Sequence, residues 1–316
     1  MRLLAAPDKF RGTLTAREAA AAIAAGAGRA GWTTHEMPLA DGGDGTLDVI
    51  GGGDRWTTVT GPLGEPVEAA WRLDEDGTAL IEAAQACGLT LAGGPERNDP
   101  LRATSRGVGE LIAAAVAEGA ERIVVFVGGV ASTDGGAGAT EAVPHPLLVP
   151  LDVACDVDAR FLEAADVFAP QKGATPEQVR ILRQRLAKLV VPDLPGSGAA
   201  GGLAGGLAAI GARLVPGFEL VAERLGLDAQ LTHSDLVLTG EGLVDATSGT
   251  GKVVGRVLAH ARDAGVEALV VAGDVAPGSP IEALSLVAGC GRERALAEPA
   301  ECLTQLVATT LAARRN

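Results

Sequence analysis

The sequence predicts an α/β fold, and three observations carry that prediction. Residues 235–252 (DLVLTGEGLVDATSGTGK) begin as an apolar strand, pass through a glycine-rich acidic loop and end where a helical pattern starts. Residues 122–127 form a second buried strand, which runs into another glycine-rich loop at 128–138. From residue 253 to the end of the chain, helical and strand patterns alternate. Such alternation is typical of a parallel sheet covered by helices.

The first elements are a strand at 3–6 and an alanine-rich helix that ends near residue 26. Thr15 and Glu18 have the spacing of a capping box, so they mark the start of this helix. Residues 56–82 have a different hydrophobic pattern, in which short apolar runs are joined by Gly-Pro and Asp-Gly turns. That pattern predicts antiparallel strands and indicates a second lobe.

The remaining elements follow from hydrophobic periodicity and capping signals. A second capping box, formed by Thr175 and Gln178, predicts a helix that begins at Pro176. The other predicted elements are strands at 56–60, 67–73, 79–82, 153–155, 189–191, 236–238 and 268–272, helices at 83–91, 109–118, 253–264 and 300–313, and a helix–strand unit around 284–288.

The composition excludes several classes of protein. The 316 residues carry 26 basic and 40 acidic side chains, a net charge of −14, and only 3% aromatic residues. An acidic chain with few aromatics is a poor nucleic-acid binder, and we expect no membrane segment either. The four cysteines form no Cys-x-x-Cys pair, which favours a reducing cytoplasm.

Acidic and glycine residues recur together where strands end. These loops carry Asp8, Asp41 with Asp44, Asp134, Asp156 with Asp158, and Glu241 with Asp245. Lysines and arginines are interspersed among them. Carboxylates can hold Mg²⁺, whereas glycine amides and basic side chains hold phosphates, so the set favours a Mg²⁺-dependent phosphotransferase. For any single loop, an ordinary solvated turn is the alternative interpretation.

Two competing motifs are weaker. Residues 196–201 match the dinucleotide pattern Gly-x-Gly-x-x-Gly, but prolines separate them from the strand at 189–191, whereas the pattern should follow a strand directly. Asp156 and Asp158 follow a strand as in phosphatases with an aspartyl nucleophile, yet Ala159 and Arg160 stand where a small hydroxylated residue is wanted. A non-catalytic nucleotide-binding module is the third alternative.

Taken in order, the motifs resemble those of the bacterial glycerate kinases of the two-domain type. The resemblance covers nearly the whole chain and rests on a series of segments rather than on one motif. The matching segments are 6–15, 40–46, 60–67, 97–98, 104–105, 107–112, 128–129, 134–138, 153–158, 170–174, 198–203, 239–242, Asp245 and 251–252.

The resemblance implies two α/β lobes, with a mainly parallel sheet in the first, a mixed sheet in the second and the active site in the cleft between them. We place the first lobe at 1–50 plus 233–316 and the second at 51–232. The activity it implies is ATP-dependent phosphorylation of D-glycerate with Mg²⁺, giving 2-phosphoglycerate or else 3-phosphoglycerate. We expect a cytoplasmic monomer or homodimer. The alternatives are a kinase of a related small hydroxy or sugar acid and a non-catalytic nucleotide-binding protein.

Loop position and charge assign roles to particular residues. The predicted catalytic residues are Asp8, Lys9, Arg11, Asp41 and Asp245. The predicted nucleotide-binding residues are Gly128, Gly129, Asp134, Gly135, Gly136, Lys172, Glu241 and Lys252. The predicted metal ligands are Asp41, Asp156 and Asp245.

The chain departs from the family pattern at three places. The family usually carries a longer segment between Gly138 and Val153. It has an Asn-Pro-Leu stretch after Asp158, which is replaced here by residues 159–163, and it tends to place a basic residue where this chain has Leu243. The last two departures touch expected site loops, so they bear on the choice of substrate.

Overall fold

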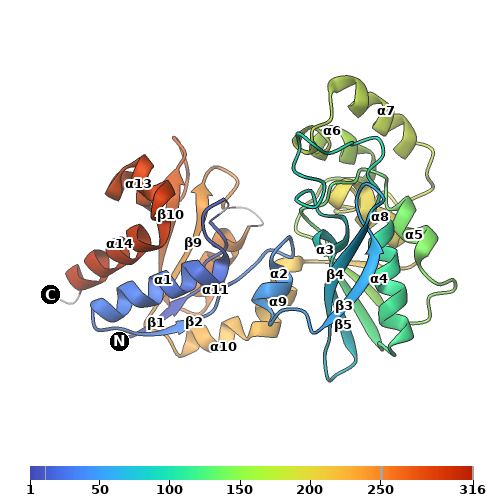
Figure 1. Ribbon diagram of the computed structural model, residues 1–316. Helices are drawn as coiled ribbons and strands as arrows, with labels where there is room; N and C mark the ends of the chain where they lie inside the picture. The colour runs from blue at the N-terminus through green and yellow to red at the C-terminus, as the bar shows by residue number, and fades with distance from the viewer. Residues whose placement is uncertain (11, 250–251, 315–316) are drawn as a thin grey trace. The chain divides into compact units, whose positions relative to one another are not determined.

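The computed structural model describes residues 1–10, 12–249 and 252–314, and it divides into two compact units. Unit 1 comprises Met1–Asp41 and Val221–Asn316, and unit 2 comprises Gly42–Leu220. Each unit combines one β-sheet with helices (Figure 1). The predicted α/β class is therefore confirmed.

The sheet of unit 1 has five strands in the order β11-β10-β9-β1-β2, and every neighbouring pair is parallel. Its strands are β1 (Arg2–Ala5), β2 (Thr33–Glu36), β9 (Leu236–Val244), β10 (Glu267–Val275) and β11 (Leu284–Ser285). Because parallel strands end at the same edge, the residues after β1 and those late in β9 are neighbours: the Asp8 amide donates to the Gly240 carbonyl at 2.8 Å.

Helices cover both faces of this sheet. They are α1 (Ala16–Arg29), α10 (Leu227–Thr232), α11 (Val253–Asp263), α12 (Leu286–Cys290), α13 (Arg292–Ala297) and α14 (Pro299–Ala313). On one face, α1 and α14 share a core with Leu3, Leu236 and Leu238, and the two helices lie side by side (Figure 1). Gly26 permits this approach, because a Cβ there would lie 2.5 Å from the Thr304 carbonyl oxygen. Val254 of α11 packs on the other face.

The sheet of unit 2 has six strands in the order β3-β4-β5-β6-β7-β8. The strands are β3 (Arg55–Thr60), β4 (Pro66–Leu73), β5 (Thr78–Glu82), β6 (Arg122–Phe126), β7 (Leu151–Ala154) and β8 (Arg213–Val215). The pairs β3–β4 and β4–β5 are antiparallel, and the remaining pairs are parallel. The predicted mixed sheet is thus confirmed.

Unit 2 carries the larger apolar core, in which residues of α4 and α8 pack against this sheet. Its helices are α2 (Thr46–Val49), α3 (Ala83–Cys87), α4 (Arg106–Ala117), α5 (Ala137–Ala142), α6 (Ala164–Phe168), α7 (Pro176–Leu186) and α8 (Leu203–Ala209), with short 3₁₀ turns at Phe161–Glu163, Pro170–Lys172 and Ala199–Gly202. Helix α9 (Gly217–Leu225) spans the division between the units. Among the described residues no helix is both long and apolar enough to cross a membrane.

Several sequence-based boundaries need correction. The strand expected to stop after residue 238 continues to Val244, because β10 pairs with it along the whole extension. Gly240 allows this pairing, since a Cβ there would lie 2.2 Å from the Val271 carbonyl oxygen. The helix expected at 83–91 ends at Cys87, and residues 189–191 form no strand. Strands β2 and β8 were not predicted.

The boundaries between the two units lie at other residues than those expected from the sequence. Residues 42–50 were placed in the first lobe, but they belong to unit 2. The reason is a buried carboxylate at the end of β5: Glu82 accepts hydrogen bonds from the backbone N–H groups of Gly45 (3.0 Å) and Leu47 (2.8 Å). This contact ties α2 to the sheet of unit 2.

Candidate functional site

In unit 1, Asp8 follows the carboxyl end of β1. One of its oxygens accepts a hydrogen bond from the Lys9 backbone N–H at 2.7 Å. Burial, the Asp41 carboxylate and, more weakly, the Glu241 carboxylate raise the pKa of Asp8 to about 7. A carboxyl group with a pKa near neutrality can both accept and release a proton under physiological conditions.

Glu241 lies within β9 and is buried, with 8% of its surface exposed. The Lys252 ammonium lies 3.6 Å from Glu241 Oε2 and 3.7 Å from Asp245 Oδ1. Burial raises the pKa of Glu241 despite this lysine. Its other oxygen, Oε1, is buried and has no hydrogen-bond partner.

Asp245 lies just past the end of β9, where its own turn holds it. Its Oδ1 accepts hydrogen bonds from the Thr247 hydroxyl at 2.6 Å and from the Thr247 N–H at 2.7 Å, and these bonds lower the pKa of Asp245. Its backbone N–H donates to the hydroxyl of the buried Ser248 at 3.0 Å. Asp245 is therefore an ionised acid beside Lys252.

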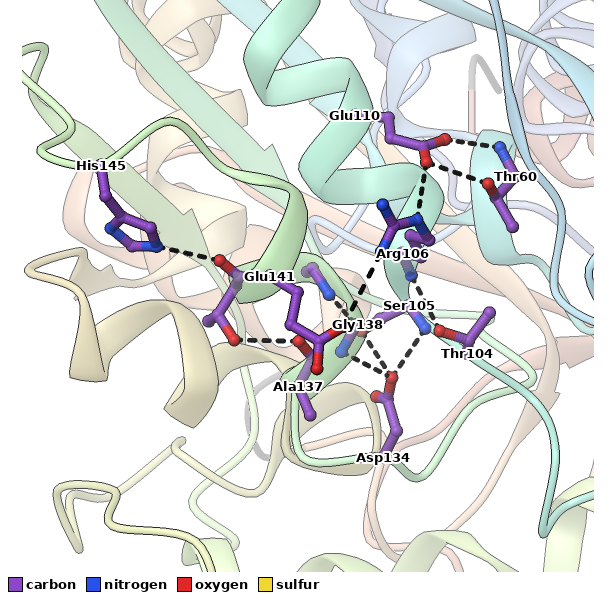
Figure 2. A network of polar contacts seen from close by, with 12 residues as sticks. Thr60, Thr104, Ser105, Arg106, Glu110, Asp134, Ala137, Gly138, Glu141 and His145 are labelled. Atoms are coloured by element: carbon purple, nitrogen blue, oxygen red, sulfur yellow. Dashed lines mark hydrogen bonds and ion pairs between the residues drawn. The ribbon is translucent and has the colours of Figure 1, made fainter.

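In unit 2, Asp134 organises the glycine-rich loop between β6 and α5 (Figure 2). Its Oδ2 accepts hydrogen bonds from the Ser105 N–H and hydroxyl, both at 2.8 Å, and from the Gly138 N–H at 3.3 Å. Its Oδ1 accepts a bond from the Gly136 N–H at 3.1 Å. Gly135 and Gly136 have left-handed backbone angles (φ +68° and +76°), which favour glycine. The Asp134 carboxylate thus fixes the loop from within.

A second set of polar contacts connects this loop to neighbouring elements. The Arg106 guanidinium donates to Glu110 at 3.0 Å, and Glu110 in turn accepts bonds from the Thr60 N–H (2.6 Å) and hydroxyl (2.9 Å). Arg106 also lies 3.7 Å from Glu141 of α5 (Figure 2). The start of α4, the start of α5 and the end of β3 are therefore held to one another.

Lys172 lies beneath this loop, with 4% of its surface exposed. Its ammonium donates to the Ser132 carbonyl oxygen at 2.5 Å and lies 3.5 Å from the Thr133 hydroxyl. Burial lowers the pKa of Lys172 to about 8, although the neighbouring Cys87 and Asp134 oppose that shift. In this position Lys172 contacts the loop backbone.

The two glycine loops of unit 2 touch each other. A Cβ at Gly128 would lie 2.6 Å from the Gly43 Cα, and a Cβ at Gly129 would lie 2.9 Å from the Asp44 Cβ. Only glycines allow these backbones to approach so closely. The backbones at 43–44 and 128–129 therefore pack directly against each other.

The structure places the predicted metal ligands in different settings. Asp41 and Asp245 belong to unit 1, whereas Asp156 belongs to unit 2, where its carboxylate accepts bonds from the N–H groups of Gly217 (2.9 Å) and Phe218 (2.6 Å) at the start of α9. Within the described ranges, no three His, Cys, Asp or Glu side chains lie close enough together to hold a metal ion by themselves. The metal assignment stays a prediction. It is compatible with Mg²⁺, which usually binds one or two carboxylates together with substrate phosphates.

The other predicted site residues fall into two groups, one in each unit. Unit 1 gathers Asp8, Asp41 and Glu241 near one another, and Lys252 with Glu241 and Asp245. Unit 2 gathers Asp134, the loop glycines and Lys172. Arg11, Thr250 and Gly251 lie outside the described residues, and the expected cleft between the lobes stays a prediction.

Sequence reasoning missed Glu82, Ser105 and Thr239, a fully buried residue of β9 whose hydroxyl has no hydrogen-bond partner. Glu82 closes an otherwise apolar strand, and an acid in that place is a signal that could have been noticed. Ser105 precedes a helix, a position that often carries a capping side chain. Thr239 gives no signal of its own, because threonine is common in strands.

Comparison with known proteins identifies what the chain resembles. The sequence model of the glycerate kinase family matches residues 3–148 and 144–310. The glycerate kinase of Bacillus subtilis is 37% identical over 327 residues, covering 87% of this chain and 85% of that protein. The glycerate 2-kinase of Escherichia coli is 37% identical over 305 residues, covering 80% of each. A crystal structure from Salmonella typhimurium, described as a glycerate kinase 2, superposes with a TM-score of 0.79 at 33% identity and covers 100% of this chain and 98% of that one.

Proposed function

The chain belongs to the glycerate kinase family and is a kinase; we propose that it transfers the terminal phosphoryl group of ATP to D-glycerate and forms 2-phosphoglycerate. The name of the Escherichia coli relative supports the 2-position. The free thiols of all four cysteines fit a cytoplasmic location.

The observation that carries this proposal is the group of carboxylates beside the end of β1. Phosphoryl transfer to an alcohol needs an acceptor for the hydroxyl proton, and a carboxyl group with a pKa near the operating pH suits that role. Asp8 has a pKa of about 7, raised chiefly by its burial and by Asp41. We assign the proton acceptor to Asp8.

In the reaction, the substrate hydroxyl oxygen forms a bond to the terminal phosphorus while the bond from that phosphorus to the leaving oxygen of ADP breaks. The hydroxyl proton passes to Asp8. The ammonium groups of Lys9 and Lys252 are assigned to the substrate carboxylate and the phosphoryl oxygens, because positive charge stabilises both. Asp41 and Asp245 are the residues that would hold Mg²⁺, which neutralises phosphate charge when bound.

We assign the nucleotide to the two glycine loops of unit 2, at 42–46 and 128–138. The loop between β6 and α5 is fixed by Asp134 and Lys172, and glycine backbones allow phosphate groups to approach closely. In this assignment Asp134 and Lys172 act through the loop, since both side chains already bond to it.

The direct test is an assay that couples ADP release to absorbance, with Mg²⁺, ATP and D-glycerate. We expect turnover that requires all three components. The alternative substrates are other small hydroxy or sugar acids, and turnover with one of these in place of D-glycerate would correct the substrate. ATP binding with no turnover on any acid would indicate a non-catalytic nucleotide-binding protein.

A further inference from the structure

In the described part of the chain, two buried side-chain oxygens of β9 lack hydrogen-bond partners. They are the hydroxyl of Thr239, which is fully buried, and Oε1 of Glu241, which is 8% exposed. Residues two apart on a strand project from the same face, so both side chains lie on one side of the sheet. A buried polar atom without a partner is costly and calls for an explanation.

The surroundings of Glu241 indicate what could bond to it. Its Oε2 is already near the Lys252 ammonium, at 3.6 Å. The carboxylates of Asp8 and Asp245 lie close enough to Glu241 to interact with its charge. These carboxylates disfavour a phosphate or carboxylate at Oε1, whereas a carboxylate oxygen readily accepts a hydrogen bond from a neutral donor.

From this geometry we propose that Glu241 Oε1 accepts a hydrogen bond from a hydroxyl group of the acceptor substrate, a small polyhydroxylated acid, and that Thr239 lies in the same subsite. The sequence had assigned Glu241 to the nucleotide, but the buried carboxylate fits an alcohol better than a phosphate. The proposal rests on the proposed kinase function and names the group that recognises its substrate.

The subsite makes a prediction about selectivity. A site with a buried acceptor rejects analogues that lack the matching hydroxyl, because the acceptor is then left unpaired. D-Lactate lacks the 3-hydroxyl of D-glycerate, and 3-hydroxypropanoate lacks the 2-hydroxyl. One of these two analogues should therefore bind markedly less tightly than D-glycerate.

The test combines variants with analogues. Calorimetry measures the Kd of D-glycerate, D-lactate and 3-hydroxypropanoate for the wild type, Glu241→Gln and Thr239→Val, each with a saturating non-hydrolysable ATP analogue. Glu267→Gln is the control, since it removes an exposed carboxylate from β10 of the same sheet. We expect the wild type to prefer D-glycerate about 10-fold or more over one analogue, which corresponds to one lost hydrogen bond. Glu241→Gln should weaken that preference, because an amide oxygen accepts a weaker hydrogen bond than a carboxylate oxygen, whereas Glu267→Gln keeps it.

Stability separates a ligand subsite from a structural role. Removing an unpartnered buried polar atom should leave the melting temperature unchanged or raise it. Thr239→Val, nearly isosteric, should thus be at least as stable as the wild type and bind D-glycerate more weakly. If both variants keep the wild-type preference among the three acids, the subsite proposal is overturned. If the wild type binds D-glycerate selectively through Glu241 but releases no ADP from ATP, the proposed kinase reaction is refuted and the subsite proposal stands.

Discussion

Protonation of single buried groups depends on what surrounds each of them. Burial and neighbouring carboxylates disfavour the charge of Asp8 and raise its pKa to about 7, whereas burial alone lowers the pKa of the Lys172 ammonium to about 8. Both groups have ordinary pKa values in the unfolded chain. Each shift therefore makes the free energy of unfolding depend on pH.

Asp8→Asn tests the assigned proton acceptor. Turnover should fall by about 10²–10⁴-fold with a smaller change in KM, as expected for a group that acts in the transition state. The folded protein holds the Asp8 proton up to about pH 7, so the wild type loses stability from this group as pH rises from about 4 to 7. The stability of the variant relative to wild type should grow over that range and stay constant above it. Unchanged turnover would remove Asp8 from the mechanism.

Lys172→Met tests the buried ammonium. Between the folded pKa of about 8 and the ordinary value of 10.5, the unfolded chain binds the proton that the folded chain has released. Wild-type stability should therefore rise with pH relative to the variant, by about 1.4 kcal/mol per pH unit at most. Urea unfolding at pH 7.5 and 9.5 measures the difference. Lys188→Met, which removes an exposed ammonium, controls for the loss of charge, and a pH-independent difference would contradict the shift.

At the scale of elements, buried carboxylates hold the glycine loops in place. Asp134 fixes the loop between β6 and α5, and Glu82 fixes the start of α2. Because Gly129 packs on Asp44, the two loops support each other.

Glu82→Gln should lower the free energy of unfolding by about 1–3 kcal/mol, because an amide NH₂ then faces a backbone N–H that loses its acceptor. Chemical denaturation measures this loss. Glu118→Gln is the matched control: Glu118 is exposed and pairs with Arg55, so its removal should change stability by less than about 1 kcal/mol. Equal effects of the two substitutions would contradict the role given to Glu82.

The sequence predicted most elements because their signals are local. Both capping boxes are present as expected, at Thr15 with Glu18 and at Thr175 with Gln178. The end of β9 was missed because Gly240 and Gly242 look like a loop in sequence, and only pairing with β10 makes them a strand. Long-range pairing has no local signature, which is also why the tie from Glu82 to α2 could not be foreseen.

At the scale of the whole molecule, the series of motifs predicted the family correctly, while no single motif did. The boundary between the two units could not be predicted at the same level, because nothing in the sequence of residues 42–50 indicates that they belong to unit 2. The segment at 159–163, in which Phe161 is buried, is a further example. It departs from the family pattern, yet Phe161 packs beneath Gly135 and Gly202, so the change is accommodated in a core.

A ligand that binds only the folded chain stabilises it. ATP with Mg²⁺ and D-glycerate should each raise the melting temperature. At a ligand concentration of 100 times the Kd, the free energy of unfolding should rise by about 2.7 kcal/mol. Differential scanning calorimetry with and without each ligand measures the shift. No shift with ATP at millimolar concentration would contradict nucleotide binding.

The central claim is tested most directly by identifying the product. Phosphorus NMR of a completed reaction with Mg²⁺, ATP and D-glycerate distinguishes a phosphate ester of the 2-hydroxyl from one of the 3-hydroxyl. We predict ADP and 2-phosphoglycerate in equal amounts. Formation of 3-phosphoglycerate, or of inorganic phosphate without any phosphoglycerate, would contradict the proposed reaction.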